Sequence, residues 1–387
     1  MYKYVFNPFI LLLIVVTCIY SYYNFYQEPR VKINKGVCEV KAKVLKVDNS
    51  EVRTSGLSNI GFQELEINIL EGNFYGRNVR ATNNLVGNTD IENLFSEGDI
   101  IIAAIIQKDG NIEHVKAVDL YRQNTLLFLF SIFIFALILY AGVVGVKALI
   151  SFILTVFIIW EVLVRLILEG YSPLIVTTYT IFLMSAVIIF LVAGVNRKGI
   201  SAFIGTICGL LVTLLVTFVF GSKVGLFGLT QPYVNSLIFS GYYQLDIRQV
   251  FYSAILLGAS GACMDIAMDI AASMDEVKNK KPDISQIELI RSGFTVGRHV
   301  IGTMATTLLL AYSGGYLTLL LLFQVKEPSI MRMINMKIVA AEIMRTLVGS
   351  IGLVLVAPIT AIVGGIIIAG VDKKIKADKK DGLVKTN

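Results

Sequence analysis

Hydrophobic residues occupy long, almost uninterrupted runs along most of this chain. Runs of about 20 apolar residues are long enough to cross a lipid bilayer as helices. The predicted spans are Val5–Tyr23, Thr125–Val146, Ala148–Leu168, Leu174–Gly194, Ile200–Phe220, Gln249–Ser273, Val300–Phe323 and Glu342–Gly370. The predicted fold class is mainly α, a polytopic helical membrane bundle of about eight spans.

Residues 27–124 follow a different pattern, in which apolar and polar residues alternate. The alternation is visible in Val37–Val44 and in Leu65–Leu70. Further strand candidates, separated by Gly, Asn and Asp turns, are Gly76–Ala81, Asp99–Ile106 and Ile112–Leu120. Five short strands predict a small β-rich barrel or sandwich, and an OB-like barrel is the first interpretation.

These patterns divide the chain into four parts. Residues 1–26 form an N-terminal signal-anchor span, interpreted as retained rather than cleaved because no small-residue cleavage site follows it. Residues 27–124 form an extracytoplasmic β-rich domain, and 125–371 a seven-span membrane domain. Residues 372–387 form a basic cytoplasmic tail.

Composition supports a membrane protein. Of 387 residues, 55% are hydrophobic, and the mean hydropathy is +0.72. The net charge of +6 does not indicate nucleic-acid binding, because the basic residues lie in loops and the tail, and residues 27–124 balance their acidic and basic side chains. The Lys and Arg bias of the short loops places both termini in the cytoplasm and residues 27–124 outside.

Two segments complicate this topology. The loop from Lys326 to Lys337 places three basic residues outside, unless it returns to the membrane surface as an interfacial helix. Residues 225–246 are moderately apolar but broken by Pro232, which is typical of a re-entrant or interfacial segment.

No enzymatic motif is present. The four cysteines have neither disulfide nor metal-ligand spacing, so no metal and no cofactor is expected. The sequence has no Walker A, no G-x-S-x-G and no H-E-x-x-H motif. We therefore expect no enzyme and no ATP-driven pump.

Asp265 and Asp269 are the first candidates for an ion or substrate pathway. Four residues apart in an apolar span, they share one helix face. Intramembrane carboxylates are costly and usually mark a pathway or proton relay. The alternative is a solvated or salt-bridged pair at the cytoplasmic end of the span, close to Asp275 and Glu276.

Three further charged pairs lie in or at predicted spans. Glu342 and Arg345 either form a local structural pair or let Arg345 counter Asp265 or hold an anionic substrate. Glu161 and Arg165 favour intrahelical pairing. Arg298 and His299 open a span, and His299 is either an interfacial residue or a pH sensor.

Small residues allow helices to approach closely. The candidate helix-packing positions are Gly258, Gly261, Gly302, Gly349 and Gly352.

Three blocks resemble a known family: GASGACMDIAMDIAAS at 258–273, RSGFTVGRHVIGTMATTLLLAYSGG at 291–315 and EIMRTLVGSIGLVLVAPIT at 342–360. They resemble the YibE/F family of multi-span bacterial membrane proteins, and the order of anchor, ectodomain and membrane domain is similar across essentially the whole chain. The chain departs at His299, where the family usually has Asp, and at Ala305-Thr306, where it favours Thr-Asn. If those positions serve a site with Asp265, this member has altered selectivity or coupling.

The resulting prediction is a secondary transporter or permease of the bacterial cytoplasmic membrane, proton- or cation-linked, with its site in spans six to eight. The alternative is a membrane scaffold or envelope assembly factor that acts through its ectodomain. The expected partners are the lipid bilayer and a small ion or small-molecule substrate, with a homo-oligomer as an open possibility and no nucleic acid.

Overall fold

The computed structural model describes residues 37–56, 58–87, 92–108 and 110–384, and the side chains of this part except those of residue 55 and residues 370–384. The described chain divides into two compact units, one that ends at Leu139 and one that begins at Tyr140. The predicted span Val5–Tyr23 lies outside the described residues.

The first unit contains a closed five-stranded barrel. Its strands are β1 (Val37–Ser55), β2 (Ser58–Ile69), β3 (Asn78–Val86), β4 (Ile100–Lys108) and β5 (Asn111–Leu120). They are hydrogen-bonded in the order β1-β2-β3-β5-β4, antiparallel except for the parallel contact of β3 with β5. All five predicted strands are present, and the small β-barrel is confirmed. A five-stranded Greek-key barrel is the architecture of the OB-fold.

Alternation along the strands builds the core of the barrel. On β2, residues at every second position from Gln63 to Ile69 are buried and their neighbours are more exposed. The buried side chains that meet inside include Leu65, Ile67 and Ile101. The buried Gln63 satisfies its amide with four partners: it donates to Asn49 Oδ1 and Phe95 O, and it accepts from Phe95 N and Asn83 Nδ2.

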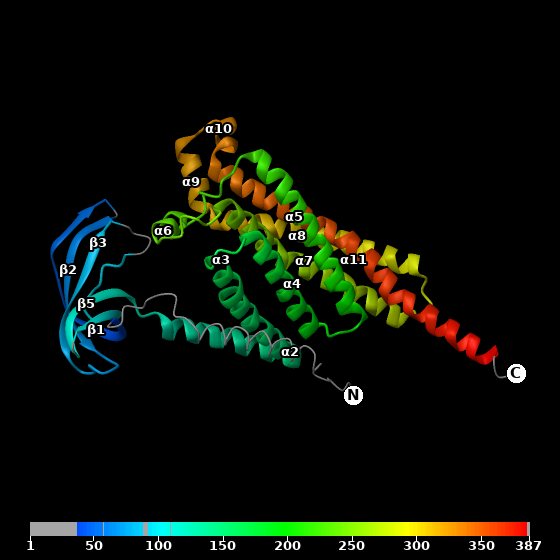
Figure 1. Ribbon diagram of the computed structural model, residues 1–387, viewed down its shortest axis with the longest axis horizontal. Coiled ribbons are helices and arrows are strands. Elements are labelled where there is room, and N and C mark those ends of the chain that lie inside the picture. The colour runs from blue at the N-terminus through cyan, green and yellow to red at the C-terminus, as the bar shows by residue number, and fades with distance from the viewer. Residues whose placement is uncertain (1–36, 57, 88–91, 109, 385–387) are drawn as a thin grey trace. The chain divides into compact units, whose positions relative to one another are not determined.

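The rest of the described chain is helical (Figure 1). It begins with α2 (Gln123–Phe157), which continues through a π-helical turn, η1 (Ile158–Val164), into α3 (Arg165–Leu168). Gly142 interrupts α2, since its φ of 54° and ψ of −126° are not helical. Only glycine adopts such angles readily.

The main helices of the second unit pack around α7 and α11. They are α4 (Pro173–Val192), α5 (Arg197–Val224), α7 (Ile247–Lys280), α8 (Gln286–Gly315) and α11 (Lys337–Val384). Three short helices complete the unit: α6 (Val234–Phe239), α9 (Leu317–Lys326) and α10 (Ile330–Asn335). The largest buried cluster joins α7 and α11 and includes Ile266, Ile270, Leu353 and Val356.

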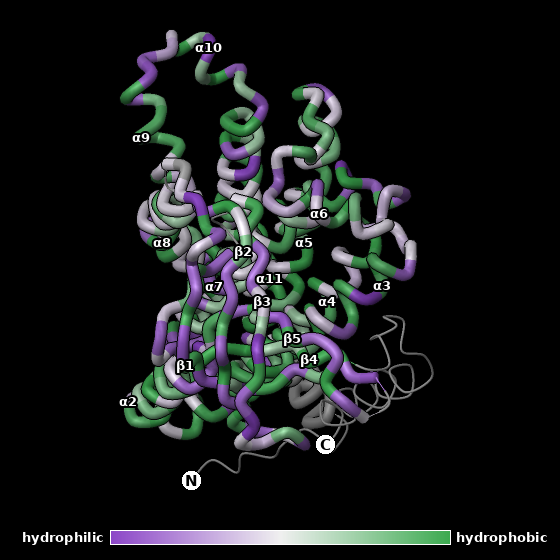
Figure 2. The backbone as a smooth tube through the Cα atoms, turned by 90° about the vertical axis from the view of Figure 1, so that its left-hand side faces the viewer, coloured by the Kyte–Doolittle hydropathy of each residue, from purple (hydrophilic) through white to green (hydrophobic). Residues whose placement is uncertain are grey.

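Among the described residues, five helices are long and apolar enough to cross a membrane, and the bent pair α8–α9 would make a sixth. Figure 2 shows that hydrophobic residues dominate these helices, whereas the strands are mixed. The predicted second and third spans both lie in one continuous stretch, Gln123–Leu168. The predicted seventh span includes the bend between α8 and α9, which sequence periodicity did not reveal.

Candidate functional site

The most buried ion pair in the described helices joins Glu342 and Arg345 in the second turn of α11. Arg345 Nη1 lies 3.5 Å from Glu342 Oε1, and the two side chains are 14% and 15% exposed. Arg345 Nη2 also donates to Gln231 Oε1, at 2.6 Å, and its guanidinium carbon lies 5.8 Å from the centroid of the Phe251 ring. Arg345 is therefore held by the segment that precedes α6 and by the start of α7.

This cluster leaves polar atoms unsatisfied. Within the described residues, Glu342 Oε2, Arg345 Nε and Gln231 Nε2 are buried and have no hydrogen-bond partner. A buried polar group without a partner costs about 1–3 kcal/mol, and more when it is charged. Each such group needs an explanation, and we therefore treat this cluster as the candidate site.

The cluster borders a break between two helices. The axes of α8 and α9 differ by 70°, and the break falls at Tyr316, immediately after Ser313-Gly314-Gly315. Kinks commonly occur at Gly and Ser residues, because these offer little side-chain packing to support a straight helix. The sequence carried this signal in its Ser-Gly-Gly triplet, but the apolar run on both sides concealed it.

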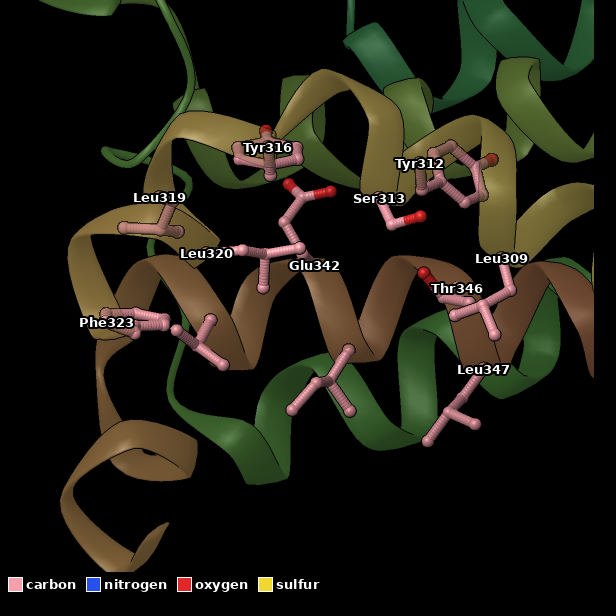
Figure 3. A pocket seen from close by; sticks show the side chains of 12 residues that line it. Leu309, Tyr312, Ser313, Tyr316, Leu319, Leu320, Phe323, Glu342, Thr346 and Leu347 are labelled. Atoms are coloured by element: carbon pink, nitrogen blue, oxygen red, sulfur yellow. The ribbon is translucent and has the colours of Figure 1, made fainter. Parts of the chain in front are cut away.

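A cavity of about 270 Å³ lies between this elbow and α11. We call it the elbow cavity. Its lining residues are Leu309, Tyr312, Ser313, Tyr316, Leu319, Leu320, Phe323, Val339, Glu342, Ile343, Thr346 and Leu347. The Glu342 carboxylate points toward Tyr316, with which it interacts, and the hydroxyls of Ser313 and Thr346 lie further along the same cavity (Figure 3).

Asp265 and Asp269 lie on a different part of the surface. Both are exposed, on the face of α7 that also presents Gly261 and Ala272, while Ile266 and Ile270 on the other face are buried. In the part of the chain that the structure describes, neither carboxylate has an ion-pair or hydrogen-bond partner. Arg345 pairs with Glu342 and Gln231 instead of Asp265.

Arg298 and His299 lie in the middle of α8, rather than at its start, and both are exposed. Among the described side chains, no ion pair or hydrogen bond connects them to Asp265, Asp269 or Glu342. The six predicted pathway residues therefore fall into three groups: the pair on α7, the pair on α8 and the buried pair on α11.

The predicted pairing of Glu161 with Arg165 occurs in an unexpected setting. Arg165 Nη1 lies 4.0 Å from Glu161 Oε2, and Arg165 Nε lies closer, 3.2 Å, to Glu169 Oε1. Glu161 lies within the π-helical turn Ile158–Val164. The sequence spacing pointed to Glu161, and the structure adds Glu169 as a closer partner of Arg165.

Most of the glycines at the closest helix contacts are not the ones that the sequence predicted. A methyl group added at Gly205 or Gly209 of α5 would overlap Thr360 or Val356 of α11, and one at Gly352 would overlap Thr213 of α5. Gly205 and Gly209 form a small-xxx-small pattern that sequence inspection could have found.

The predicted packing positions differ in their surroundings. A methyl group at Gly258 would meet the Tyr312 hydroxyl at 2.7 Å, and one at Gly349 would make an ordinary contact with Ala259. Gly261 and Gly302 have nothing within 4 Å.

These observations define a mainly helical protein that combines a small N-terminal β-barrel with a bundle of long apolar helices, one of them broken beside a buried charge. The sequence profile described as YibE/F-like protein matches residues 129–370, which include the whole helical bundle from α4 to α9 and most of α2 and α11. The chain belongs to the YibE/F-like protein family. Comparison with curated proteins and with solved structures gives no match.

Proposed function

We propose that this protein is a secondary transporter or permease of the bacterial cytoplasmic membrane, linked to protons or another cation. The proposed activity moves a substrate without covalent chemistry. Its site lies in α7, in the broken helix α8–α9 and in α11, the helices that correspond to predicted spans six to eight.

Membrane insertion is supported by the surface of the helices. Large apolar side chains such as Leu139, Phe218 and Leu355 are exposed along helices that are apolar on most faces. An apolar helix that is not covered by protein is stable in hydrocarbon, where all its backbone groups are satisfied internally.

The proposed topology places both termini in the cytoplasm and residues 27–124 outside. The α4–α5 turn, the α7–α8 turn and the last part of α11 lie at one end of the bundle (Figure 1). Basic residues cluster at these turns, including Arg197, Lys198, Lys278, Lys280 and Lys281. By the positive-inside rule this end faces the cytoplasm.

The single observation that carries the transport proposal is the buried Glu342–Arg345 pair beside the α8–α9 break. Charged residues inside a membrane bundle are expensive and mark pathways more often than they stabilise the fold. Broken helices in transporters place free backbone groups and charged side chains around a substrate or ion site near the middle of the bilayer. The unsatisfied atoms of the cluster are consistent with a ligand that completes them.

The exposed pair on α7 fits the same activity as a proton or cation relay. Asp265 and Asp269 are one helical turn apart on the same face of α7, so both carboxylates are available to one cation. A cation that reaches this face would find two carboxylates that no basic side chain of the described chain neutralises.

The test is flux in proteoliposomes that contain the purified protein. Proton and cation movement is measured under an imposed gradient for the native protein, for Asp265→Asn and for Glu342→Gln. Glu64→Gln, which alters an exposed carboxylate on the β-barrel, is the matched control. Gradient-dependent flux that both bundle variants abolish and the control retains supports transport. An absence of flux for every common cation overturns it.

A second candidate function is that of a membrane scaffold or envelope assembly factor acting through the barrel. It is favoured by an apolar patch where β2 pairs with β3: Ile60, Phe62 and Val86 are 49%, 53% and 76% exposed. In this case Phe62→Ser would abolish capture of a defined partner, whereas Asp265→Asn would have no effect on capture.

A further inference from the structure

We propose that the elbow cavity binds an organic cation, namely a small amine attached to an apolar body. The inference rests on the proposed transport function and names the substrate class of the same site. It places the ammonium group at Glu342 and the apolar part among the leucines of α8, α9 and α11.

The charge of the lining selects a cation. Among the described residues that line the cavity, Glu342 alone is charged. Its Oε1 faces Arg345 at 3.5 Å, while its Oε2 is buried and has no hydrogen-bond partner. Arg345 is not among the lining residues: it contacts Gln231 and Phe251, although it also interacts with Tyr316 of the lining. An ammonium N–H would supply the donor that Oε2 lacks, in a charge-assisted hydrogen bond.

Aromatic rings strengthen this preference. Tyr312 of α8 and Tyr316 at the end of that helix line the cavity, and Tyr316 interacts with the Glu342 carboxylate of α11 (Figure 3). The face of an aromatic ring attracts a cation, with greater effect where the cation is desolvated. The hydroxyls of Ser313 and Thr346 lie within the same cavity. Anionic ligands are disfavoured, since no basic residue lines it.

The rest of the lining excludes a bare metal ion. Ca²⁺ takes six to eight oxygen ligands, and Mg²⁺ requires an octahedral set. The elbow cavity offers one carboxylate, and the described part of the chain contains no group of three or more His, Cys, Asp or Glu residues that could hold a metal. A single carboxylate surrounded by leucine and phenylalanine suits an ammonium group with an apolar substituent.

The mouth of the cavity supports an amphiphilic ligand. Leu309, Leu320 and Leu347 line it and are 53%, 48% and 57% exposed. In the membrane position proposed above, such side chains face hydrocarbon. A ligand with an apolar body could therefore partition into the bilayer and enter sideways, whereas a fully hydrated ion could not.

The experiment measures equilibrium binding of radiolabelled benzylamine to the full-length protein in detergent. Benzyl alcohol and phenylacetate, which share its ring but are neutral and negative, serve as competitors. We expect saturable binding of benzylamine and no competition by phenylacetate. Benzyl alcohol should compete about tenfold or more weakly than unlabelled benzylamine, because it cannot form the charge-assisted hydrogen bond.

Two variants localise the ligand. Glu342→Gln removes the charge, and Thr346→Phe fills part of the cavity while keeping the carboxylate. Each should reduce affinity by about tenfold or more. Their matched controls are Glu276→Gln, an exposed carboxylate at the end of α7, and Leu310→Phe, an exposed residue of α8 outside the cavity. Both controls should bind like the native protein. If Glu342→Gln does not fold, Thr346→Phe and its control decide the outcome.

Benzylamine binding that Thr346→Phe leaves unchanged, or phenylacetate competing equally well, would overturn the assignment. Because binding is measured without a gradient, its failure is distinct from failure of transport. Cation flux that depends on Asp265 in a protein that binds no benzylamine rejects this substrate class and retains the transporter. Specific binding without any flux retains the site and rejects transport.

Discussion

Arg345 Nη1 lies 3.5 Å from Glu342 Oε1 inside the helical bundle, and Gln231 accepts a second hydrogen bond from the same guanidinium at 2.6 Å. One arginine thus joins α11 to the segment before α6. Removing either charged partner leaves the other charge buried without compensation.

We therefore expect Arg345→Leu to destabilise the bundle by about 3–5 kcal/mol. The double variant Arg345→Leu with Glu342→Leu should be less destabilised than Arg345→Leu alone, because no unpaired charge remains. The measurement is the midpoint of thermal unfolding in detergent, combined as a double-mutant cycle. Strictly additive effects would show that the two side chains do not interact.

The α5–α11 interface gives a second prediction. Gly209→Ala places a methyl group against Val356 and should cost about 1–3 kcal/mol, the usual effect of overpacking. Gly302→Ala is the matched control, since nothing lies within 4 Å of that position. It should stabilise α8 by up to about 1 kcal/mol, because alanine has the higher helix propensity. Thermal unfolding of the two variants, compared directly, checks the prediction, and equal destabilisation would contradict it.

A third prediction concerns the core of the barrel. Gln63→Leu removes the partner of both backbone groups of Phe95 and one of the two acceptors of Asn83 Nδ2, which keeps Asn93 O. Buried groups left unsatisfied cost about 1–3 kcal/mol each, so the barrel should lose at least about 2 kcal/mol. Hydrogen–deuterium exchange of β2 and β3 in the full-length protein reports the loss. Glu64→Gln, at an exposed position on the same strand, should leave exchange unchanged.

The orientation of α7 can be tested with thiol chemistry. In a background with Cys18, Cys38 and Cys208 changed to Ser, Cys263 is the remaining thiol, and it is 0% exposed. N-ethylmaleimide should not label it until the protein is denatured. Adding Glu276→Cys should produce a thiol that labels in the folded protein, because that position is exposed near the end of α7. Labelling of Cys263 itself in the native fold would contradict the described packing of α7.

The barrel could be predicted from sequence because its signal is local. Alternation of period two places Leu65, Ile67 and Ile69 on one face, and turn residues end each strand. Strand ends were less predictable, since β1 continues to Ser55, well beyond the alternating stretch that ends at Val44. Pairing with β2 through two register shifts supports this extension, and such pairing is not encoded locally.

The candidate site was only partly predictable. Charge beside an apolar run identified Glu342 and Arg345, and their i, i+3 spacing allowed the pair as one of two alternatives. The Gln231 partner is far away in sequence, and the apolar residues on both sides concealed the signal that Ser313-Gly314-Gly315 carried for the 70° bend at Tyr316. Asp265 lies apart from Arg345 because of the way α7 is rotated about its axis. Apolar residues lie on several faces of α7, so the sequence alone does not determine that rotation.

Gly142 is the residue at which the helical stretch of α2 is interrupted. Without its non-helical angles, the stretch from Gln123 to Leu168 would form one rod of 46 residues, about 69 Å long at the usual rise. That is roughly twice the thickness of the hydrocarbon core. Any side chain at this position opposes the interruption. In the proposed membrane position, glycine at 142 therefore allows two helices of about bilayer length, whereas a side chain there would favour one continuous rod.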